Sequence, residues 1–465
     1  MTINLRNFSP RWLIFWGFAT WAFLRTSIFF IDFNVTFTVE AMGLMAAYIG
    51  AFVIGTFLVT SRAYDDQTLG RDVGNEDEAF ASTEGERGAR LTNGYRKAAV
   101  VLFTITFIFL VLRMYDLFFV RGFLSAESIQ AFRNSENNFT GADRSSSGIS
   151  FITGIGYPIA IPAFIFTIAF RRYLTKRMQW TGYGLFAFYG IYVNLSGNRY
   201  ILLGPMFEAV VCLAIANGRL LITKKSMVIV GIVASIIFGF LTLGTMQRDL
   251  LFGATTREEA VAVSPERKLY VPSPGFVLWF HEQPEIVQNL LWSYVDIAWY
   301  NTHGMFEWQK TYDYANPEEL AWGTCQYATA TYFFRILGIT IKDEDKWRRN
   351  VPTYGFYSTF FGPAYLDFGV AWGLIYLLAL GVIAQHMWVL TLRGKLIGTL
   401  LYPYVASVVY NMADNNLIQA GLGIPIMAVT VMAAIIIRLN AKRENLNISG
   451  NSPASITSQP TVPAN

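Results

Sequence analysis

Residues 192–205 read YVNLSGNRYILLGP, so two apolar stretches flank a short polar break that contains Arg199. The preceding Gly197 and Asn198 are residue types that favour a tight turn. A guanidinium group stays charged and presents a planar fork of N–H donors, which suits a phosphate or diphosphate. Arg199 therefore either anchors the chain at a membrane surface or binds an anion, depending on the side of the membrane that it faces.

The composition indicates which elements position this arginine. Of the 465 residues, 53% are hydrophobic, 16% are aromatic and only 15% are charged. A soluble chain of this length carries more charge, and abundant aromatic residues are typical of membrane interfaces. About ten stretches have the length and apolar character of a membrane span: 11–31, 39–60, 97–120, 150–170, 179–197, 200–218, 226–246, 362–390, 396–412 and 420–438. We therefore expect an all-α polytopic membrane protein, with 11–31 as its first span and not a cleaved signal.

The basic residues predict an orientation. They concentrate in four short connections, at 171–177, 218–225, 392–395 and 438–443. Short basic connections stay in the cytoplasm, and one alternation of spans places all four there together with both termini. Spans 179–197 and 200–218 are short and meet at Arg199, so a re-entrant pair remains an alternative to two full spans.

The spans divide the chain into four parts. Residues 1–246 hold the first seven spans, a cytoplasmic loop at 61–96 and an external loop at 121–149. Residues 247–361 form a large external loop, in which the aromatic stretch 276–308 predicts helices that lie on the membrane or cap the bundle. Residues 362–444 hold the last three spans, and 445–465 read as a disordered cytoplasmic tail.

Charged residues inside the spans fall mostly in their outer halves: Arg25, Asp32, Arg113, Asp116, Glu208, Asp367 and Asp414. A charge in hydrocarbon costs at least about 2.5–3.5 kcal/mol, so several on one side predict a polar cavity that opens outward. Arg113 and Asp116 are one helical turn apart and can pair. For Asp32, Asp367 and Asp414, simple snorkelling to the interface remains an equal alternative.

The external loop supplies further candidates. It contains His281 and His303, and histidine is the residue type that suits proton transfer at neutral pH, although a loop histidine is more often a hydrogen-bonded surface residue. Arg348 and Arg349 are candidates for an anion, with a solvated charge cluster beside Asp343 as the alternative. The remaining candidates for diphosphate or sugar binding are Asn198, Arg248, Arg335, Tyr354 and Tyr357, next to Arg25 and Arg113.

Several classes of chemistry lack their sequence signals. The chain has no P-loop, no glycine-rich dinucleotide turn and no DxD pair of a metal-dependent glycosyltransferase. Its two cysteines, Cys212 and Cys325, are far apart, and three histidines do not indicate a metal site. The net charge of +4 does not indicate a nucleic-acid partner. We expect no metal and no cofactor.

The layout resembles the bacterial oligosaccharide repeat-unit polymerases of the Wzy type, which are relatives of the O-antigen ligases. The resemblance covers most of the chain and rests on SGNR (196–199), one dominant late external loop, and TYGFYSTFFGPAYLDFGVAWG (353–373). It implies a glycosyltransferase C-like membrane fold in the bacterial inner membrane, with the reaction at the periplasmic face.

The resemblance also implies a reaction and its partners. A glycan on undecaprenyl diphosphate would move to the sugar end of a second lipid-linked repeat unit, and a chain-length regulator is a possible partner. Arg199 would neutralise the leaving diphosphate, and His281 or His303 would take the acceptor's proton. An O-antigen ligase that transfers the glycan to lipid A core, a polysaccharide flippase and a membrane O-acyltransferase are the alternatives.

Overall fold

The computed structural model describes residues 2–32, 35–59, 86–120, 153–154, 156–195, 203–221, 271–315, 319–327, 359–418 and 423–450, and the isolated residues 223, 228, 231 and 239. This part of the chain is mostly helical. Its longer helices are α1 (Pro10–Ser27), α2 (Val39–Leu58), α4 (Glu86–Tyr115), α7 (Ala160–Ala169), α8 (Lys176–Leu195), α9 (Leu203–Asn217), α12 (Pro274–His281), α13 (Glu285–Tyr300), α14 (Gly304–Tyr314), α17 (Phe361–Leu392), α18 (Leu396–Tyr410) and α19 (Gly423–Gly450). Three short helical turns extend them: π-helical η3 (Asp116–Val120) continues α4, 3-10 helix η4 (Tyr157–Ile159) opens α7, and η7 (Asn411–Ala413) closes α18.

Five of the described helices are long and apolar enough to cross a membrane: Val39–Leu58, Thr92–Val120, Phe361–Leu392, Leu396–Ala413 and Gly423–Asn440. They coincide with five of the predicted spans and make the chain a multi-pass membrane protein. Two further predicted spans, 150–170 and 200–218, correspond to the shorter apolar helices Tyr157–Ala169 and Gly204–Asn217. The predicted spans 11–31 and 179–197 overlap α1 and α8, which have 18 and 20 residues but are not among the five helices apolar enough to cross a membrane. Span 226–246 lies almost wholly outside the described residues.

The closest helix pair is α2 with α17. Gly55 of α2 and Gly381 of α17 face each other's backbones, and a Cβ at either position would collide with a carbonyl oxygen, of Leu378 or of Phe52. Small residues of this kind let membrane helices approach closely. The pairing fixes α17, which carries the YLDFG sequence at its start.

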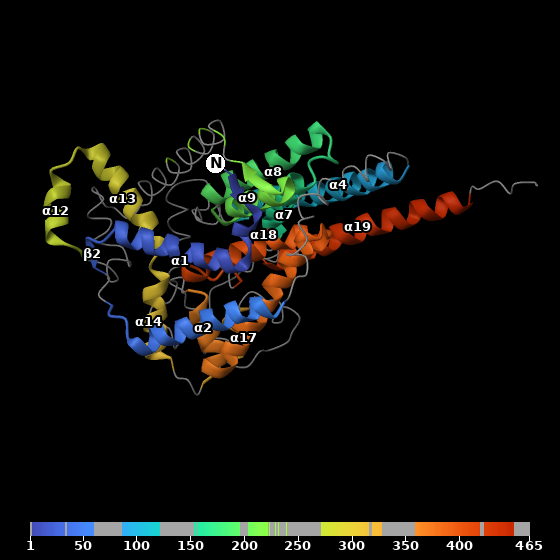
Figure 1. Ribbon diagram of the computed structural model, residues 1–465. Helices are drawn as coiled ribbons and strands as arrows, with labels where there is room; N and C mark the ends of the chain where they lie inside the picture. The colour runs from blue at the N-terminus through green and yellow to red at the C-terminus, as the bar shows by residue number, and fades with distance from the viewer. Residues whose placement is uncertain are drawn as a thin grey trace, which may run out of the picture.

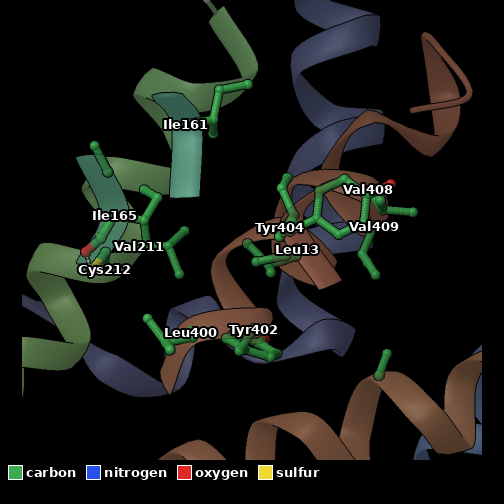
Figure 2. Packing of buried hydrophobic residues seen from close by; sticks show 14 of the residues in the cluster. Leu13, Ile161, Ile165, Val211, Cys212, Leu400, Tyr402, Tyr404, Val408 and Val409 are labelled. Atoms are coloured by element: carbon green, nitrogen blue, oxygen red, sulfur yellow. Dashed lines mark hydrogen bonds between the residues drawn. The ribbon is translucent and has the colours of Figure 1, made fainter. Parts of the chain in front are cut away.

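Helices α1, α4, α7, α8, α9, α18 and α19 contribute to one continuous core. Helices α12 and α13 pack in a second cluster with Ile28 and Ile31. Figure 2 shows Val408 and Val409 of α18 beside Leu13 of α1, with Ile165 of α7 next to Cys212 of α9. The Cys212 thiol donates to the Ile165 carbonyl oxygen at 3.6 Å. In Figure 1, α4 and α19 run side by side away from the rest of the molecule, and Lys97 Nζ donates to Asn440 Oδ1 at 2.9 Å between them.

Two short antiparallel pairings hold opposite ends of α1. Strand β1 (Thr2–Asn4) pairs with β3 (Arg219–Leu221), with Thr2 opposite Leu221. Strand β2 (Ile31–Asp32) pairs with β4 (Val271–Pro272), with Ile31 opposite Pro272. Figure 1 shows β2 beside α12, away from the N-terminus. The first pairing thus joins two segments that the basic residues place in the cytoplasm, and the second joins two that they place outside.

The aromatic stretch forms α12, α13 and α14, as its composition predicts. Helix α14 does not only cover the end of the bundle but is part of its core. Trp308 is fully buried in the main core and donates from Nε1 to the Ala41 carbonyl oxygen at 3.2 Å. Glu307 of the same helix is also buried, at 2% exposed, and forms an ion pair with Lys310 at 3.0 Å.

Candidate functional site

Charged side chains are distributed unequally between the two ends of the helix bundle. At the end marked by β1 and β3, most basic residues are exposed, among them Arg6, Arg96, Lys97, Arg177, Arg219, Arg393, Lys395 and Arg438, while Arg11 and Arg171 are half-buried. At the end marked by β2 and β4, a set of charged and titratable residues is buried or half-buried: Arg25, Arg113, Asp116, Glu208, His303, Glu307, Asp367 and Asp414. Other charged residues at this end are exposed, among them Asp32, Glu40, His281, Glu282, Glu285 and Asp313. Buried charges need partners, so this second end, which we call the polar end, is where a site is expected.

A series of contacts joins the helix termini at the polar end. Phe207 of α9 stacks on Tyr410 of α18, with ring centroids 4.4 Å apart. The Tyr410 hydroxyl lies 2.9 Å from the Thr20 hydroxyl of α1, and the adjacent Trp21 donates from Nε1 to the Thr302 carbonyl oxygen at 3.1 Å. Helices α9, α18 and α1 therefore meet the turn between α13 and α14.

Arg113 lies at one edge of the polar end, in the last turn of α4. Its Nη1 donates to Asp116 Oδ2 at 2.7 Å, and its Nε donates to the Tyr192 hydroxyl at 2.8 Å. The guanidinium also lies over the rings of Tyr157 and Tyr192, 5.4 and 5.5 Å from their centroids. The pairing that the spacing of Arg113 and Asp116 predicts is confirmed. The structure adds that Arg113 connects α4 to α7 and α8, which the sequence did not indicate.

Arg25 lies in the last turn of α1, where Nη1 donates to the Ile28 carbonyl oxygen at 3.4 Å. Its guanidinium carbon is 5.9 Å from the ring centroid of Phe306, in the first turn of α14. Phe306 is one turn from His303, so the structure brings two of the predicted site residues, Arg25 and His303, to the same junction of α1 with α13 and α14.

His303 is held in one orientation. The ring is 3% exposed and stacks on Trp299, with centroids 4.7 Å apart and an interplanar angle of 17°. Its Nδ1 lies 2.7 Å from the Tyr300 carbonyl oxygen. A carbonyl oxygen only accepts, so Nδ1 carries a proton, and Nε2 of the neutral ring keeps its lone pair. Burial lowers the pKa of His303 to about 4, so the neutral ring persists at neutral pH.

His281 has a different environment. It is exposed at the C-terminus of α12, and its ring meets Phe280 edge-to-face at 5.9 Å. The structure therefore separates the two predicted histidines into an exposed residue and a buried one.

Asp367 organises the start of α17. Its carboxylate accepts the backbone N–H of Cys325 at 2.9 Å and of Gln326 at 2.5 Å. Two residues later, Gly369 has a φ of +59° and interrupts the helix, and its carbonyl oxygen accepts from the Tyr48 hydroxyl at 2.7 Å. The YLDFG sequence thus contains both the break in the helix and the carboxylate that binds the segment 321–327 through two backbone N–H groups.

The segment 321–327 brings further polar groups to the polar end. Asn416 Nδ2 donates to Gln326 Oε1 at 2.8 Å, and the Tyr327 hydroxyl lies 3.2 Å from that of Tyr376. Gln326 Nε2 and the Thr359 hydroxyl are buried and have no hydrogen-bond partner among the described residues. Gln326 and Asn416 do not stand out in the sequence, because they lie 90 residues apart in the chain.

Most of the other predicted site residues lie outside the described residues. These are Arg199, Asn198, Arg248, Arg335, Arg348, Arg349, Tyr354 and Tyr357. The described chain leaves α8 at Leu195, one turn after Tyr192 contacts Arg113, and resumes in α9 at Leu203. Of the predicted site residues, the structure describes Arg25, Arg113, His281 and His303; Arg25 and His303 meet at the junction of α1 with α14, and Arg113 lies separately between α4 and α8.

Comparisons of the chain with protein-family models, with curated proteins and with solved structures find no match. The resemblance to Wzy-type polymerases therefore remains a prediction that rests on the residues and the layout.

Proposed function

We propose that the chain is a lipid-diphosphate-dependent glycosyltransferase of the inner membrane, which joins undecaprenyl-diphosphate-linked oligosaccharides into a surface polysaccharide. The observation that carries the proposal is the uneven placement of charge: half-buried arginines, buried and half-buried carboxylates, and the buried His303 collect at one end of the bundle. The exposed basic residues of the other end suit the cytoplasmic side, so the polar end would face the periplasm.

The residues fit the requirements of this reaction. The donor is already activated, so the protein must bind and neutralise a leaving diphosphate, position the acceptor and accept a proton. Arg25 would bind the diphosphate together with Arg199, which is a candidate from the sequence alone. Arg113 would hold the ends of α4, α7 and α8 around it. Aromatic side chains of α13 and α14 would stack on sugar rings.

The test is transfer by purified protein. Lipid-linked oligosaccharides would be extracted from cells that lack the gene, then incubated with the protein in detergent, with a chelator and without nucleotide. We expect a ladder of repeat units. A ladder that requires a divalent ion would contradict metal-free neutralisation of the diphosphate, and no transfer at all would contradict the proposed function. Transfer only after lipid A core is added would identify a ligase.

A further inference from the structure

The carboxylates of Glu208 and Asp414 at the polar end differ from the other carboxylates there in their hydrogen bonding. Asp116 is paired with Arg113, Glu307 with Lys310, and Asp367 with two backbone N–H groups. Among the described residues, nothing donates a hydrogen bond to Glu208 or to Asp414. An unpaired buried carboxylate is costly, so these two are candidates for a role other than stability.

Asp414 lies where several segments converge. It follows η7, and the Phe360 N–H donates to the carbonyl oxygen of Met412 at 3.1 Å. A Cβ at Gly304 would collide with the Asp414 carbonyl oxygen, so the turn next to His303 packs directly on this residue. Two residues further on, Asn416 contacts Gln326. Glu208, by contrast, is 4% exposed within the apolar helix α9.

The surroundings of Asp414 contain unused hydrogen-bonding capacity. Thr359 donates its N–H to the Gly304 carbonyl oxygen at 3.4 Å, but its buried hydroxyl has no partner among the described residues. The same holds for Nε2 of Gln326. Buried polar groups without partners call for an explanation, and a hydroxyl-rich ligand such as a sugar can use a carboxylate, an amide and a hydroxyl together. The Asp414 residue as a whole is half-buried, and its carboxyl group lies between the packed segments.

We propose that Asp414 is the proton acceptor of the glycosyl transfer, an inference that rests on the proposed function. Its carboxylate takes the proton of the acceptor sugar's hydroxyl while that oxygen bonds to the donor's anomeric carbon. The bond between that carbon and the diphosphate oxygen breaks, and lipid diphosphate leaves with the electron pair. The carboxylic acid then releases its proton to water.

The protonation of Asp414 suits this role. Its carboxyl lies deep enough between the packed segments that burial raises its pKa to about 8. A base works best when its pKa is near the working pH. The titratable residues on the elements packed against it include Arg25 of α1, His303, Glu307 and Lys310 at the start of α14, Tyr365 and Asp367 of α17, and Tyr404 and Tyr410 of α18. None of them contributes to this shift, which burial alone causes.

The test uses the purified transfer assay with the extracted lipid-linked oligosaccharides, run across pH 6–9.5. Wild-type kcat is expected to rise with pH and to level off above about pH 8. Asp414→Asn should lower kcat by roughly 100- to 10,000-fold, remove the rise with pH and leave the donor KM unchanged. Asp414→Glu should keep a weaker rate that still rises with pH. Glu285→Gln, at an exposed carboxylate of α13, is the control for loss of one charge.

The outcomes separate the two proposals. If wild-type protein transfers glycan and Asp414→Asn keeps its rate and pH dependence, Asp414 is not the base. If Glu208→Gln removes the rise with pH and Asp414→Asn does not, the role belongs to Glu208. If Asp414→Asn is purified at normal yield but loses donor binding as well as kcat, Asp414 is a structural residue. If wild-type protein transfers nothing, both the proposed function and this role fail.

Discussion

Arg113 Nη1 lies 2.7 Å from Asp116 Oδ2, and the carboxylate side chain is only 1% exposed while that of the arginine is 13% exposed. The pair spans one helical turn from α4 into η3, and Arg113 continues to the Tyr192 hydroxyl of α8. Removing one member leaves a buried charge that has lost its opposite charge, and this destabilises the fold more than replacing both members by apolar side chains.

The first prediction is a double-mutant cycle on this pair. Arg113→Met and Asp116→Leu should each destabilise the purified protein by about 3–5 kcal/mol. The double variant should recover most of that loss, because two apolar side chains replace the pair. We also expect it to keep polymer formation, since the donors of Arg113 are directed to protein groups. A double variant that is stable but makes no glycan ladder would show that Arg113 binds substrate.

A second prediction concerns Asp367. Asp367→Ala removes the acceptor for two buried N–H groups, of Cys325 and Gln326, and each unsatisfied group costs roughly 1–3 kcal/mol. We expect protease to cut between Glu319 and Tyr327 much faster than in the wild type. The matched control is Asp313→Ala, which removes an exposed carboxylate that accepts one hydrogen bond from Gln309. Equal cleavage in both variants would mean that Asp367 does not clasp the segment.

Features that depend on residues close together in the chain could be predicted from the sequence, and features that depend on distant residues could not. Apolar runs predict α2 and α18 closely, because length and composition alone define a membrane span. The Arg113–Asp116 pair follows from helical spacing. The break in α17 was not predicted, because it depends on a positive φ at Gly369. Segment 150–170 gives a shorter helix, which η4 opens with Pro158 in its first turn, where proline is tolerated.

The polar end itself was predicted as a one-sided set of charges, but its internal contacts were not. Asp367 meets Cys325 and Gln326 across 42 and 41 residues, and Asn416 meets Gln326 across 90. No local pattern encodes partners so far apart. For the same reason the sequence left two alternatives for Asp414, a polar cavity and the membrane interface, whereas the structure surrounds it with the turn at Gly304 and the segment at 359–360.

A third prediction uses the pKa of His303, which burial lowers to about 4. A histidine in an unfolded chain titrates near 6.5, so the unfolded state binds the proton more tightly. Stability is therefore complete above about pH 6.5 and falls as the pH drops toward 4, by about 3 kcal/mol in total. Thermal unfolding in detergent between pH 4 and 8 measures this loss. His303→Gln should remove this contribution to the acid sensitivity, and His281→Gln, at an exposed site, should keep it.

A fourth prediction concerns orientation. The β1–β3 pairing brings the N-terminal segment beside the connection after α9, and both carry exposed basic residues. Reporter fusions near Asn75 and Lys224 should therefore give cytoplasmic signals, and a fusion near Ala315 should give an external one. A cytoplasmic signal at Ala315 would place the polar end inside the cell and exclude the proposed reaction at the outer face.

The last prediction returns to Arg199, which the sequence places between α8 and α9. Its partner in the proposed reaction is the lipid diphosphate, on which negative charge grows as the glycosyl bond breaks. Loss of one charge-stabilising donor costs about 100- to 1000-fold in rate, so Arg199→Ala should leave the cell surface with single repeat units or none. Arg199→Lys keeps the charge without the two-pronged geometry and should give fewer or shorter chains.

The control is Arg393→Ala, at an exposed arginine of the opposite end, which should give a normal ladder. Glycan gels beside an immunoblot of membrane protein measure all three, and a full-length ladder from Arg199→Ala at normal expression would reduce Arg199 to a membrane anchor.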